Sequence, residues 1–309
     1  MTRIFVDGSA GTTGLQIHER LSRRRDLVVL PIDEALRKDP QERSRLMNES
    51  DVVFLCLPDA AAVEAAKLVT NPQVCVIDTS TAHRVAEGWT YGFPEIGRRD
   101  AIAHSRRIAN PGCHATGFIS IVYPLIASGT LPSDALLSCF SLTGYSGGGK
   151  KMIAEYEEAP APPLAAPGIY SLEQTHKHLP EMQKLCRLLH KPLFSPIVAN
   201  YYQGMATTVP LHLSQFKGAP TLTRLRRLYS DFYAGEPLIS VRMDEVDKAE
   251  KLHGNAKAGT DGLQLVVAGN GERVTITALF DNLGKGASGA AIENMNIVLG
   301  LEPSFGLRP

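Results

Sequence analysis

The chain of 309 residues is long enough for two domains, each with a buried core of its own. Hydrophobic residues make up 44% and charged residues 21% of the sequence, which excludes a disordered or collagen-like protein. The 32 basic and 32 acidic residues cancel, whereas a strongly basic nucleic-acid-binding domain needs a positive surplus to neutralise phosphates. We therefore expect a globular protein that does not bind nucleic acid.

The cysteine pattern and the N-terminal sequence predict a cytoplasmic protein. Five cysteines lie far apart and form no C-x-x-C pair, which fits reduced thiols better than a disulfide framework or a metal site. The sequence opens on a strand pattern without an apolar signal stretch before it. Because no window approaches about 18 uninterrupted apolar residues, we expect no membrane span.

The first third of the chain predicts a Rossmann-type, doubly wound α/β unit. Short apolar runs, rich in β-branched residues, alternate with helical patterns at 13–24 and 60–69. Continuous apolar strands separated by helices indicate a parallel sheet that is buried on both faces. The runs occupy residues 4–6, 27–30, 52–57 and 74–77.

The rest of the chain predicts an α+β unit with a mostly antiparallel sheet. Its apolar runs alternate more with polar residues and are joined by turns, such as the hairpin signal A-G-N-G at 268–271. A last helix pattern covers 288–299 after a Gly-rich turn. The strand runs occupy residues 135–142, 205–213, 238–241 and 263–280.

The first strand runs directly into a helix through the sequence D-G-S-A-G-T-T-G at 7–14. Glycines permit a tight turn and the close approach of a pyrophosphate, which the N–H groups at the start of the helix stabilise. The alternative is a purely structural strand-to-helix turn, but the position within a βαβ pattern favours dinucleotide binding. The predicted cofactor-binding residues are Gly8, Ser9, Ala10, Gly11, Thr12, Thr13 and Gly14.

The residues alone leave the choice between NAD and NADP open. The spacing G-x-x-G-x-x-G is met more often with phosphorylated dinucleotides than with NAD. Asp33 and Glu34 follow the second strand run, where an acid would bind the ribose 2′-hydroxyl of NAD. Arg37 and Lys38 lie just beyond and are able to pair with the 2′-phosphate of NADP, or to form only a solvated helix face.

The segment A-N-P-G-C-H-A-T-G at 109–117 predicts a nucleophilic thiol. A short strand pattern at 105–109 precedes Cys113 and a helical stripe at 113–127 follows it, so Cys113 stands at or near a helix N-terminus. The helix dipole and the free N–H groups there favour the thiolate, which is the nucleophilic form. The other four cysteines lie in apolar strand or helix patterns and are predicted to be small core residues.

Two histidines are the candidate proton partners of this thiol. His176 and His178 are two residues apart, on the same side of an extended segment. Pro180 can occupy the first turn of a helix at 181–190, which places His178 beside a positive helix end. Imidazolium is disfavoured there, so His178 is able to act as a neutral base near pH 7. A structural role for the pair is the alternative.

Several motifs in this order resemble the N-acetyl-gamma-glutamyl-phosphate reductase family in its short form. They are the opening G-S-A-G-T-T-G, D-T-S-T-A-H-R at 78–84, Y-G-F-P-E at 91–95, N-P-G-C-H-A-T-G, H-K-H-L-P-E and D-N-L-G-K-G-A-S-G-A-A at 281–291. The resemblance implies an NADPH-dependent reduction in which Cys113 attacks a γ-acyl phosphate and forms a thioester. One of His176 and His178 then supplies the acid/base function, and the helix-end argument favours His178. The family commonly has Tyr or Phe where this sequence has His114, a departure that bears on the ionisation of the neighbouring thiol.

The resemblance also implies a substrate with a carboxylate and a phosphate. Arg84 is a candidate clamp for the carboxylate, and Ser146 with Lys150 for the phosphate. The alternative for Arg84 and for Lys150 is a plain surface charge. The turn at 282–288 resembles the nicotinamide-side loop of the family. Its predicted cofactor-binding residues are Asn282, Gly286 and Ser288.

We therefore expect three segments. Residues 1–112 form a dinucleotide-binding domain, 113–285 a catalytic and oligomerisation domain, and 286–309 a helix that returns to the first domain. A sheet with one face uncovered exposes apolar surface, which predicts a homo-oligomer, a dimer or a tetramer. The alternatives are a related semialdehyde dehydrogenase, acting on aspartyl phosphate or carrier-bound aminoadipyl phosphate, and a non-catalytic dinucleotide sensor.

Overall fold

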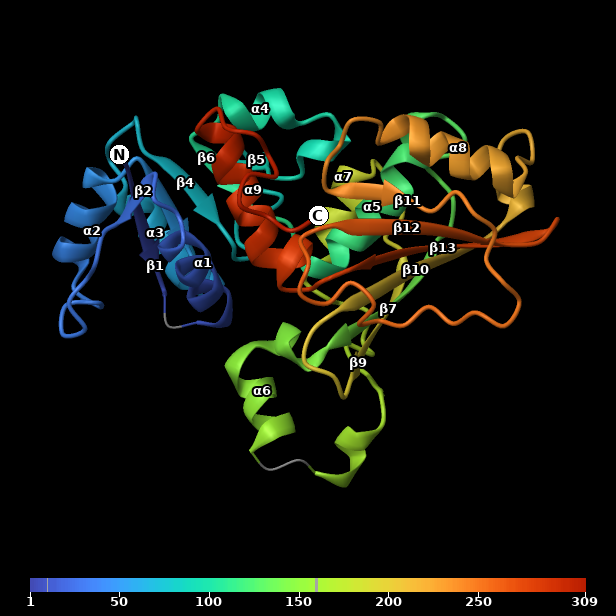
Figure 1. The fold of residues 1–309 in the computed structure, drawn as a ribbon, viewed down its shortest axis with the longest axis horizontal. Coiled ribbons are helices and arrows are strands. Elements are labelled where there is room, and N and C mark those ends of the chain that lie inside the picture. Colours follow the sequence, from blue (N-terminus) through green and yellow to red (C-terminus); the bar gives the residue numbers. More distant parts are fainter. Residues whose placement is uncertain (10, 159–160) are drawn as a thin grey trace. The chain divides into compact units, whose positions relative to one another are not determined.

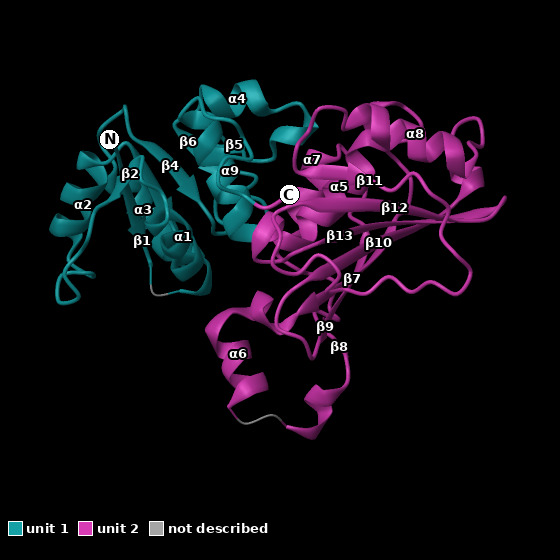
Figure 2. Cartoon of the chain, in the orientation of Figure 1, with its two compact units in different colours: residues 1–111, 287–307 teal, residues 112–286, 308–309 magenta. Residues whose placement is uncertain are grey.

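The computed structural model describes residues 1–9, 11–158 and 161–309. It divides into two compact units, which Figure 2 shows in two colours. Unit 1 contains residues 1–111 and 287–307, and unit 2 contains residues 112–286 and 308–309. Ala10, one of the predicted cofactor-binding residues, lies outside the described residues.

Unit 1 is built on a parallel sheet with the strand order β2-β1-β3-β4-β6-β5 (Figure 1). Every pairing in it is parallel, and all residues of β3 and β4 are buried, as continuous apolar runs predict. The strands are β1 (Thr2–Asp7), β2 (Leu27–Val29), β3 (Val52–Leu55), β4 (Cys75–Asp78), β5 (Thr90–Tyr91) and β6 (Arg107–Ala109).

Helices cover both faces of this sheet. On one face, Ile17 of α1 and Met295 of α9 pack in one core cluster with Ile4 of β1. On the other face, Met47 of α2 and Ala65 of α3 pack in a second cluster with alternate strand residues. The predicted doubly wound α/β unit is thus confirmed. Its helices are α1 (Thr12–Ser22), α2 (Pro40–Glu49), α3 (Asp59–Leu68), α4 (Arg99–Ala103) and α9 (Gly289–Val298).

Unit 2 contains a second sheet with the strand order β11-β12-β13-β10-β7-β9-β8. Its pairings are antiparallel except those of β11 with β12 and of β7 with β9, which confirms the predicted mostly antiparallel sheet. The strands are β7 (Ser138–Gly144), β8 (Gly168–Ile169), β9 (Leu193–Ala199), β10 (Met205–His212), β11 (Ile239–Val241), β12 (Leu263–Gly269) and β13 (Arg273–Phe280).

The long helix α5 (Cys113–Ala127) packs closely on this sheet, and it has the bounds that the sequence predicts. A Cβ atom at Gly117 would lie 2.4 Å from Oγ1 of Thr207 on β10, so only glycine allows this approach. The helix α7 (Leu179–Leu185) is shorter than the predicted 181–190. It ends early because Arg187 adopts a left-handed backbone with φ of 55°. The other helices of unit 2 are α6 (Gly149–Glu157) and α8 (Leu222–Phe232).

Within the described residues, no helix combines the length and the apolar character that crossing a membrane requires.

Candidate active site

Cys113 is the first residue of α5 and is half-buried. Its N-cap residue is Gly112, which has no side chain to bond the N–H groups of the first turn. Gly286, in the short π-helix Gly284–Ser288, approaches the same point, since a Cβ atom there would lie 2.9 Å from the Cβ of Cys113. Of the predicted cofactor-binding residues, Gly286 therefore lies next to the candidate nucleophile.

The other cysteines are poor nucleophiles. Burial raises the pKa of the Cys56 and Cys75 thiols to about 12. It raises the pKa of Cys139 and Cys186 still further above the usual range. These four thiols are therefore protonated at neutral pH, and the thiolate form is the reactive one.

His114, the residue after Cys113, is buried and hydrogen-bonded through both ring nitrogens. Its Nδ1 lies 2.8 Å from Oγ of Ser141, and its Nε2 lies 2.7 Å from the hydroxyl of Tyr170. Burial, and then the positive charges of His176 and Lys177, lower the pKa of His114 to about 3. The ring is therefore neutral at physiological pH. Sequence reasoning gave Tyr170 and Ser141 no role, because neither residue is part of a motif.

The predicted histidine pair lies against the ring of His114. The ring centroids of His176 and His178 are 4.7 Å apart, and they lie 5.5 Å and 5.6 Å from that of His114. His178 is buried, directly before α7. Its backbone N–H donates to Nδ1 of His176 at 3.2 Å. The structure thus brings both predicted histidines close to the start of α5.

A buried carboxylate completes this group of residues. Oε2 of Glu181, on α7, accepts a hydrogen bond from the backbone N–H of Gly112 at 3.1 Å. It therefore stands at the N-terminus of α5, one residue before the thiol. Sequence reasoning gave Glu181 no role, although it is the last residue of the H-K-H-L-P-E motif.

Two further predicted site residues contact each other in unit 2. The side-chain amide of Asn282 donates to Oγ of Ser146 at 3.0 Å, and its oxygen accepts from the backbone N–H of Gly204 at 2.8 Å. Both side chains are buried. Lys150 is exposed, on the second residue of α6. Asn282 and Ser146 therefore join two turns of unit 2, whereas Lys150 faces solvent.

The predicted dinucleotide loop lies in unit 1, where contacts with the main chain require two of its glycines. Gly8 has φ of +84°, and a Cβ atom there would lie 2.3 Å from the carbonyl oxygen of Cys56. A Cβ atom at Gly14 would lie 2.4 Å from the carbonyl oxygen of Gly8. The N-cap residue of α1 is Gly11, which offers no side-chain cap, so the first N–H groups of the helix stay available to an anion. Ser9 lies in the same turn, and Thr12 and Thr13 are the first residues of α1.

A pocket of about 350 Å³ in unit 1 begins at this loop and extends past the end of β2. Its acids are already paired, because Arg43 binds Asp7 at 2.6 Å and Arg37 binds Glu34 at 2.7 Å. The carboxylate of Asp33 accepts the N–H of Ala35 at 2.8 Å. The charged and polar lining residues are Asp7, Ser9, Glu34, Arg37, Lys38 and Arg43.

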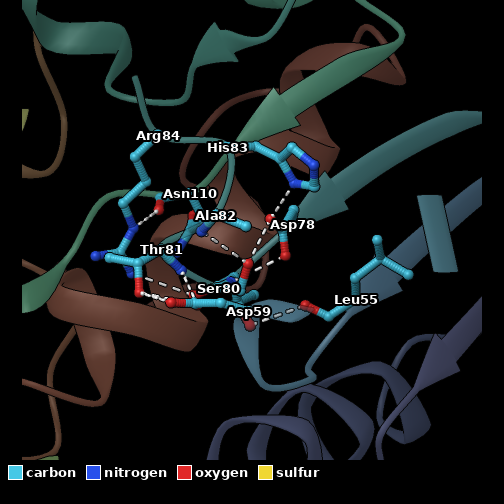
Figure 3. Close-up of polar contacts among 10 residues, drawn as sticks. Leu55, Asp59, Asp78, Ser80, Thr81, Ala82, His83, Arg84 and Asn110 are labelled. Atoms are coloured by element: carbon cyan, nitrogen blue, oxygen red, sulfur yellow. Dashed lines mark hydrogen bonds and ion pairs between the residues drawn. The ribbon is translucent and has the colours of Figure 1, made fainter. Parts of the chain in front are cut away.

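The segment after β4 forms a tight polar network in unit 1 (Figure 3). Asp78, fully buried, lies 2.6 Å from Nδ1 of His83 and accepts from Oγ of Ser80 at 2.7 Å. Arg84 donates from Nε to the carbonyl of Asn110 at 3.0 Å and from Nη2 to that of Thr79 at 3.2 Å. The guanidinium of Arg84 is thus oriented by backbone carbonyls of its own unit.

Ser288, the last predicted cofactor-binding residue, belongs to unit 1 and contacts the helix of the dinucleotide loop. Its hydroxyl donates to the side-chain oxygen of Gln16 on α1 at 3.0 Å. The predicted site residues thus divide between the two units.

Comparison with known proteins identifies the family. The model of the semialdehyde dehydrogenase NAD binding domain matches residues 9–105, and that of the semialdehyde dehydrogenase dimerisation domain matches residues 113–282. Curated N-acetyl-gamma-glutamyl-phosphate reductases of Brucella ovis and Brucella canis are 44% identical over 306 residues, which cover 96% of this chain and 99% of theirs. The chain belongs to the N-acetyl-gamma-glutamyl-phosphate reductase family. It is an oxidoreductase, and its cofactor is a nicotinamide dinucleotide.

Solved structures share the fold of this reductase family member at low identity. An aspartate semialdehyde dehydrogenase II of Vibrio cholerae has a TM-score of 0.70 and 14% identity, with 97% of this chain and 98% of that chain covered. An aspartate semialdehyde dehydrogenase of Francisella tularensis has a TM-score of 0.72 and 13% identity, with 97% and 100% covered. These likenesses establish the fold and leave substrate choice to the residues of the site.

Proposed function

We propose that the chain reduces N-acetyl-L-glutamyl 5-phosphate to N-acetyl-L-glutamate 5-semialdehyde and phosphate with NADPH, as a step of arginine biosynthesis. The observation that carries this proposal is the 44% identity to curated reductases of that name over 96% of the chain. The surroundings of Cys113 support the same reaction. A half-buried thiol begins a helix there, and the next residue is neutral His114, whose ring lies close to those of two further histidines.

In this reaction Cys113 is the nucleophile. Its thiolate attacks the carbonyl carbon of the acyl phosphate, the bond from that carbon to the phosphate oxygen breaks, and a thioester on Cys113 remains. When bound, the nicotinamide dinucleotide supplies the hydride that reduces the thioester. Breakage of the carbon–sulfur bond then releases the aldehyde and returns Cys113 to its thiolate form.

We assign the acid/base role to His178 rather than to His176. Nδ1 of His176 accepts the backbone N–H of His178, so neutral His176 has its proton on Nε2. A further proton on His176 has to break that hydrogen bond. His178 is therefore better suited to take the proton of the Cys113 thiol and to return it to the leaving phosphate.

The pocket in unit 1 supports NADPH over NADH as the reductant. Asp33 is engaged by a backbone N–H, and Glu34 and Asp7 are each paired with an arginine. Among residues 1–9, 11–158 and 161–309, no carboxylate pairs with Lys38, which lines the same pocket. The surplus positive charge of Lys38 favours a 2′-phosphate over a 2′-hydroxyl group. The glycine loop at 8–14, with Asn282, Gly286 and Ser288, would hold the rest of the cofactor.

The charged ends of the substrate require cations and N–H donors. We assign Ser146 and Lys150 to the phosphate, since Lys150 lies in the first turn of α6, a helix of nine residues. We assign Arg84 to the carboxylate, on the resemblance of D-T-S-T-A-H-R to the family motif. Its bonds to the carbonyls of Asn110 and Thr79 would fix the orientation of the guanidinium plane.

We further propose a cytoplasmic homo-oligomer, a dimer or a tetramer. The five cysteines are free, which fits a reducing compartment. The family model over residues 113–282 is named a dimerisation domain, and Phe140 of β7 and Leu193 of β9 expose 38% and 66% of their surface. A light-scattering mass equal to the monomer at micromolar concentration would contradict this assembly.

The proposed reaction is tested by following the absorbance of NADPH with three acyl phosphates in separate reactions. We expect turnover with N-acetyl-L-glutamyl 5-phosphate, and much slower turnover when NADH replaces NADPH. Turnover with only aspartyl phosphate or carrier-bound aminoadipyl phosphate would assign the chain to a related semialdehyde dehydrogenase instead. Binding of NADPH without turnover on any of the three would indicate a dinucleotide sensor.

A further inference from the structure

The segment that leads from β4 to Arg84 folds around one buried carboxylate, that of Asp78 at the end of β4. Oδ2 of Asp78 lies 2.6 Å from Nδ1 of His83 and accepts the hydroxyl proton of Ser80 at 2.7 Å. Oδ1 accepts the backbone N–H of Ser80 at 2.9 Å. Because these donors surround a fully buried carboxylate, Asp78 is the fixed point of the turn 79–84.

The hydrogen bond between Asp78 and His83 fixes the tautomer of the imidazole. A carboxylate oxygen only accepts hydrogen bonds, so Nδ1 of His83 carries a proton and donates it. The ring also stacks on the indole of Trp89, with the centroids 3.9 Å apart and the planes at 13° to each other. The side chain of His83 is therefore held by two contacts, and Arg84 is the next residue in the chain.

The guanidinium of Arg84 depends on the same acid. It donates to the carbonyls of Asn110 at 3.0 Å and of Thr79 at 3.2 Å (Figure 3). Thr79 follows Asp78 directly, and the backbone N–H of Asn110 donates to the carbonyl of Asp78 at 2.8 Å. The main chain of Asp78 thus places both acceptors of Arg84. Its carboxylate holds, through His83, the backbone from which Arg84 extends.

This arrangement leaves Arg84 half-buried, whereas His83 is buried. A guanidinium whose plane is fixed before the substrate binds loses little side-chain freedom when it pairs with a carboxylate. A buried residue that fixes this plane therefore improves the binding of an anionic substrate without contacting it. All of these contacts lie within unit 1.

We propose that His83 is a positioning residue, whose hydrogen bond to Asp78 sets the orientation in which Arg84 binds the carboxylate of the substrate. The inference rests on the proposed function in one respect, the assignment of Arg84 to that carboxylate. It gives a physical reason for two positions of the motif D-T-S-T-A-H-R at 78–84, the acid that begins it and the histidine before the arginine.

Two substitutions of His83 separate the hydrogen bond from the ring. His83→Phe keeps an aromatic ring that can stack on Trp89 but removes the donor to Asp78. His83→Asn removes the ring and keeps an N–H donor near the place of Nδ1. We expect the KM for N-acetyl-L-glutamyl 5-phosphate to rise about tenfold in His83→Phe, the effect of one lost hydrogen bond to a charged group. His83→Asn should keep this KM within about twofold, and kcat should change little in both variants.

A substrate without the carboxylate distinguishes a displaced Arg84 from a damaged fold. 4-Acetamidobutanoyl phosphate is the acyl phosphate that lacks only the carboxylate of the proposed substrate. We expect the native chain and His83→Phe to have the same kcat/KM for this analogue, because Arg84 has no carboxylate to bind in it. Equal losses of kcat/KM on both substrates would show a general disturbance of the site and would overturn the proposal.

A double variant tests whether His83 acts through Arg84. Arg84→Met removes the guanidinium, and we expect it to raise the KM for the full substrate more than His83→Phe does. Adding His83→Phe to Arg84→Met should raise the KM no further. A further rise in the double variant would give His83 a role of its own and would overturn the proposal.

His104→Gln is the matched control in unit 1. Nδ1 of His104 lies 2.9 Å from the carbonyl of Asp100, on an exposed side chain, and we expect the KM to stay unchanged. An unchanged KM in Arg84→Met would remove the assignment of Arg84 to the carboxylate, and this inference with it. A raised KM in Arg84→Met together with a native KM in His83→Phe would keep that assignment and remove only the role of His83.

Discussion

The helix α1 in unit 1 and the helix α5 in unit 2 both have a glycine as N-cap residue, Gly11 and Gly112, and neither has a side-chain cap. Their surroundings differ. At α1 the turn is shaped by missing side chains, because Gly8 and Gly14 lie against main-chain atoms that leave no space for a Cβ. At α5 side chains crowd the first turn, including His114 and the carboxylate of Glu181.

This difference separates two uses of a helix N-terminus. A turn formed by backbone alone lets a long phosphate-bearing ligand approach the N–H groups closely. A turn surrounded by imidazole, phenol and carboxylate groups handles protons around a reactive atom instead. Two other helices are capped at their N-termini by side chains. Asp39 caps α2 by accepting the N–H of Gln41, and Thr221 caps α8 by accepting the N–H of Arg224.

The largest expected effect is the loss of turnover in Cys113→Ser. A hydroxyl at this position is a far weaker nucleophile than a thiolate, so we expect kcat to fall by at least about 10³-fold. Because the turn before α1 is untouched, the Kd for NADPH should stay unchanged by fluorescence titration. Cys139→Ala, which alters a protonated core thiol, is the control and should keep its turnover. Full turnover in Cys113→Ser would show that the start of α5 does not carry the nucleophile, and the proposed difference between the two helix starts would be wrong.

The converse effect is expected from Gly8→Ala. The added methyl group meets the Cys56 carbonyl at a residue with φ of +84°, so the turn has to move, and we expect the Kd for NADPH to rise about tenfold or more. The alkylation rate of Cys113 should not change. Gly88→Ala is the matched control, since Gly88 has φ of +77° but nothing within 4 Å of the added atom. An equal loss of affinity in both variants would show that backbone strain, and not the shape of the turn, is responsible.

The sequence predicts these two turns well because their signals are local. Pro111 and Gly112 stop the preceding strand, and an unbroken apolar stripe follows, so the bounds of α5 agree with the structure. The sequence pattern does not predict the helix α2, because this helix buries only Leu46 and Met47, too few to form an apolar face. Its start signals, Asp39 followed by a proline, are nevertheless present.

The end of α7 shows where a local pattern misleads. Leu188 fits the apolar stripe of the predicted helix 181–190 and is buried, 5% exposed, but it lies beyond Leu185. Its backbone N–H donates to the carbonyl of Gln183 at 3.0 Å, across the left-handed Arg187. The chain thus reverses its course at the helix end and still buries the apolar side chain. Burial periodicity alone does not distinguish this arrangement from a longer helix.

The side chains around His114, next to Cys113, could not be predicted from the sequence, because they come from segments that lie far apart in it. Tyr170 contacts His114 across 56 residues, and Thr207 contacts Ser141 across 66. Neither Tyr170 nor Thr207 belongs to a motif with the thiol, and the pairing of β10 with β7 brings Thr207 to Ser141. The candidate nucleophile and the histidine pair are therefore predictable from local sequence, whereas the side chains that contact His114 from distant parts of the chain are not.

The smallest expected effect concerns stability in acid. It tests whether His114, in the first turn of α5, is neutral in the folded chain. An ordinary histidine has a pKa of 6.5, whereas His114 in the folded chain has a pKa of about 3. Between these pH values the unfolded chain binds a proton at this histidine that the folded chain does not. The contribution of His114 to the free energy of unfolding is therefore fully present above pH 6.5 and decreases as the pH falls. At about 1.4 kcal/mol per pH unit, His114 should account for a loss of about 2 kcal/mol between pH 7 and pH 5.

His114→Phe removes this proton-binding site while keeping an aromatic ring. Urea unfolding at pH 7 and pH 5 should show a loss of free energy that is about 2 kcal/mol smaller in the variant than in the native chain. His104→Gln, at an exposed histidine whose side chain is 78% accessible, is the control and should keep the native pH dependence. Equal losses in the native chain and in His114→Phe would mean that His114 takes up a proton in the folded state. A protonated His114 donates from both ring nitrogens, so it could no longer accept a hydrogen bond from either Ser141 or Tyr170.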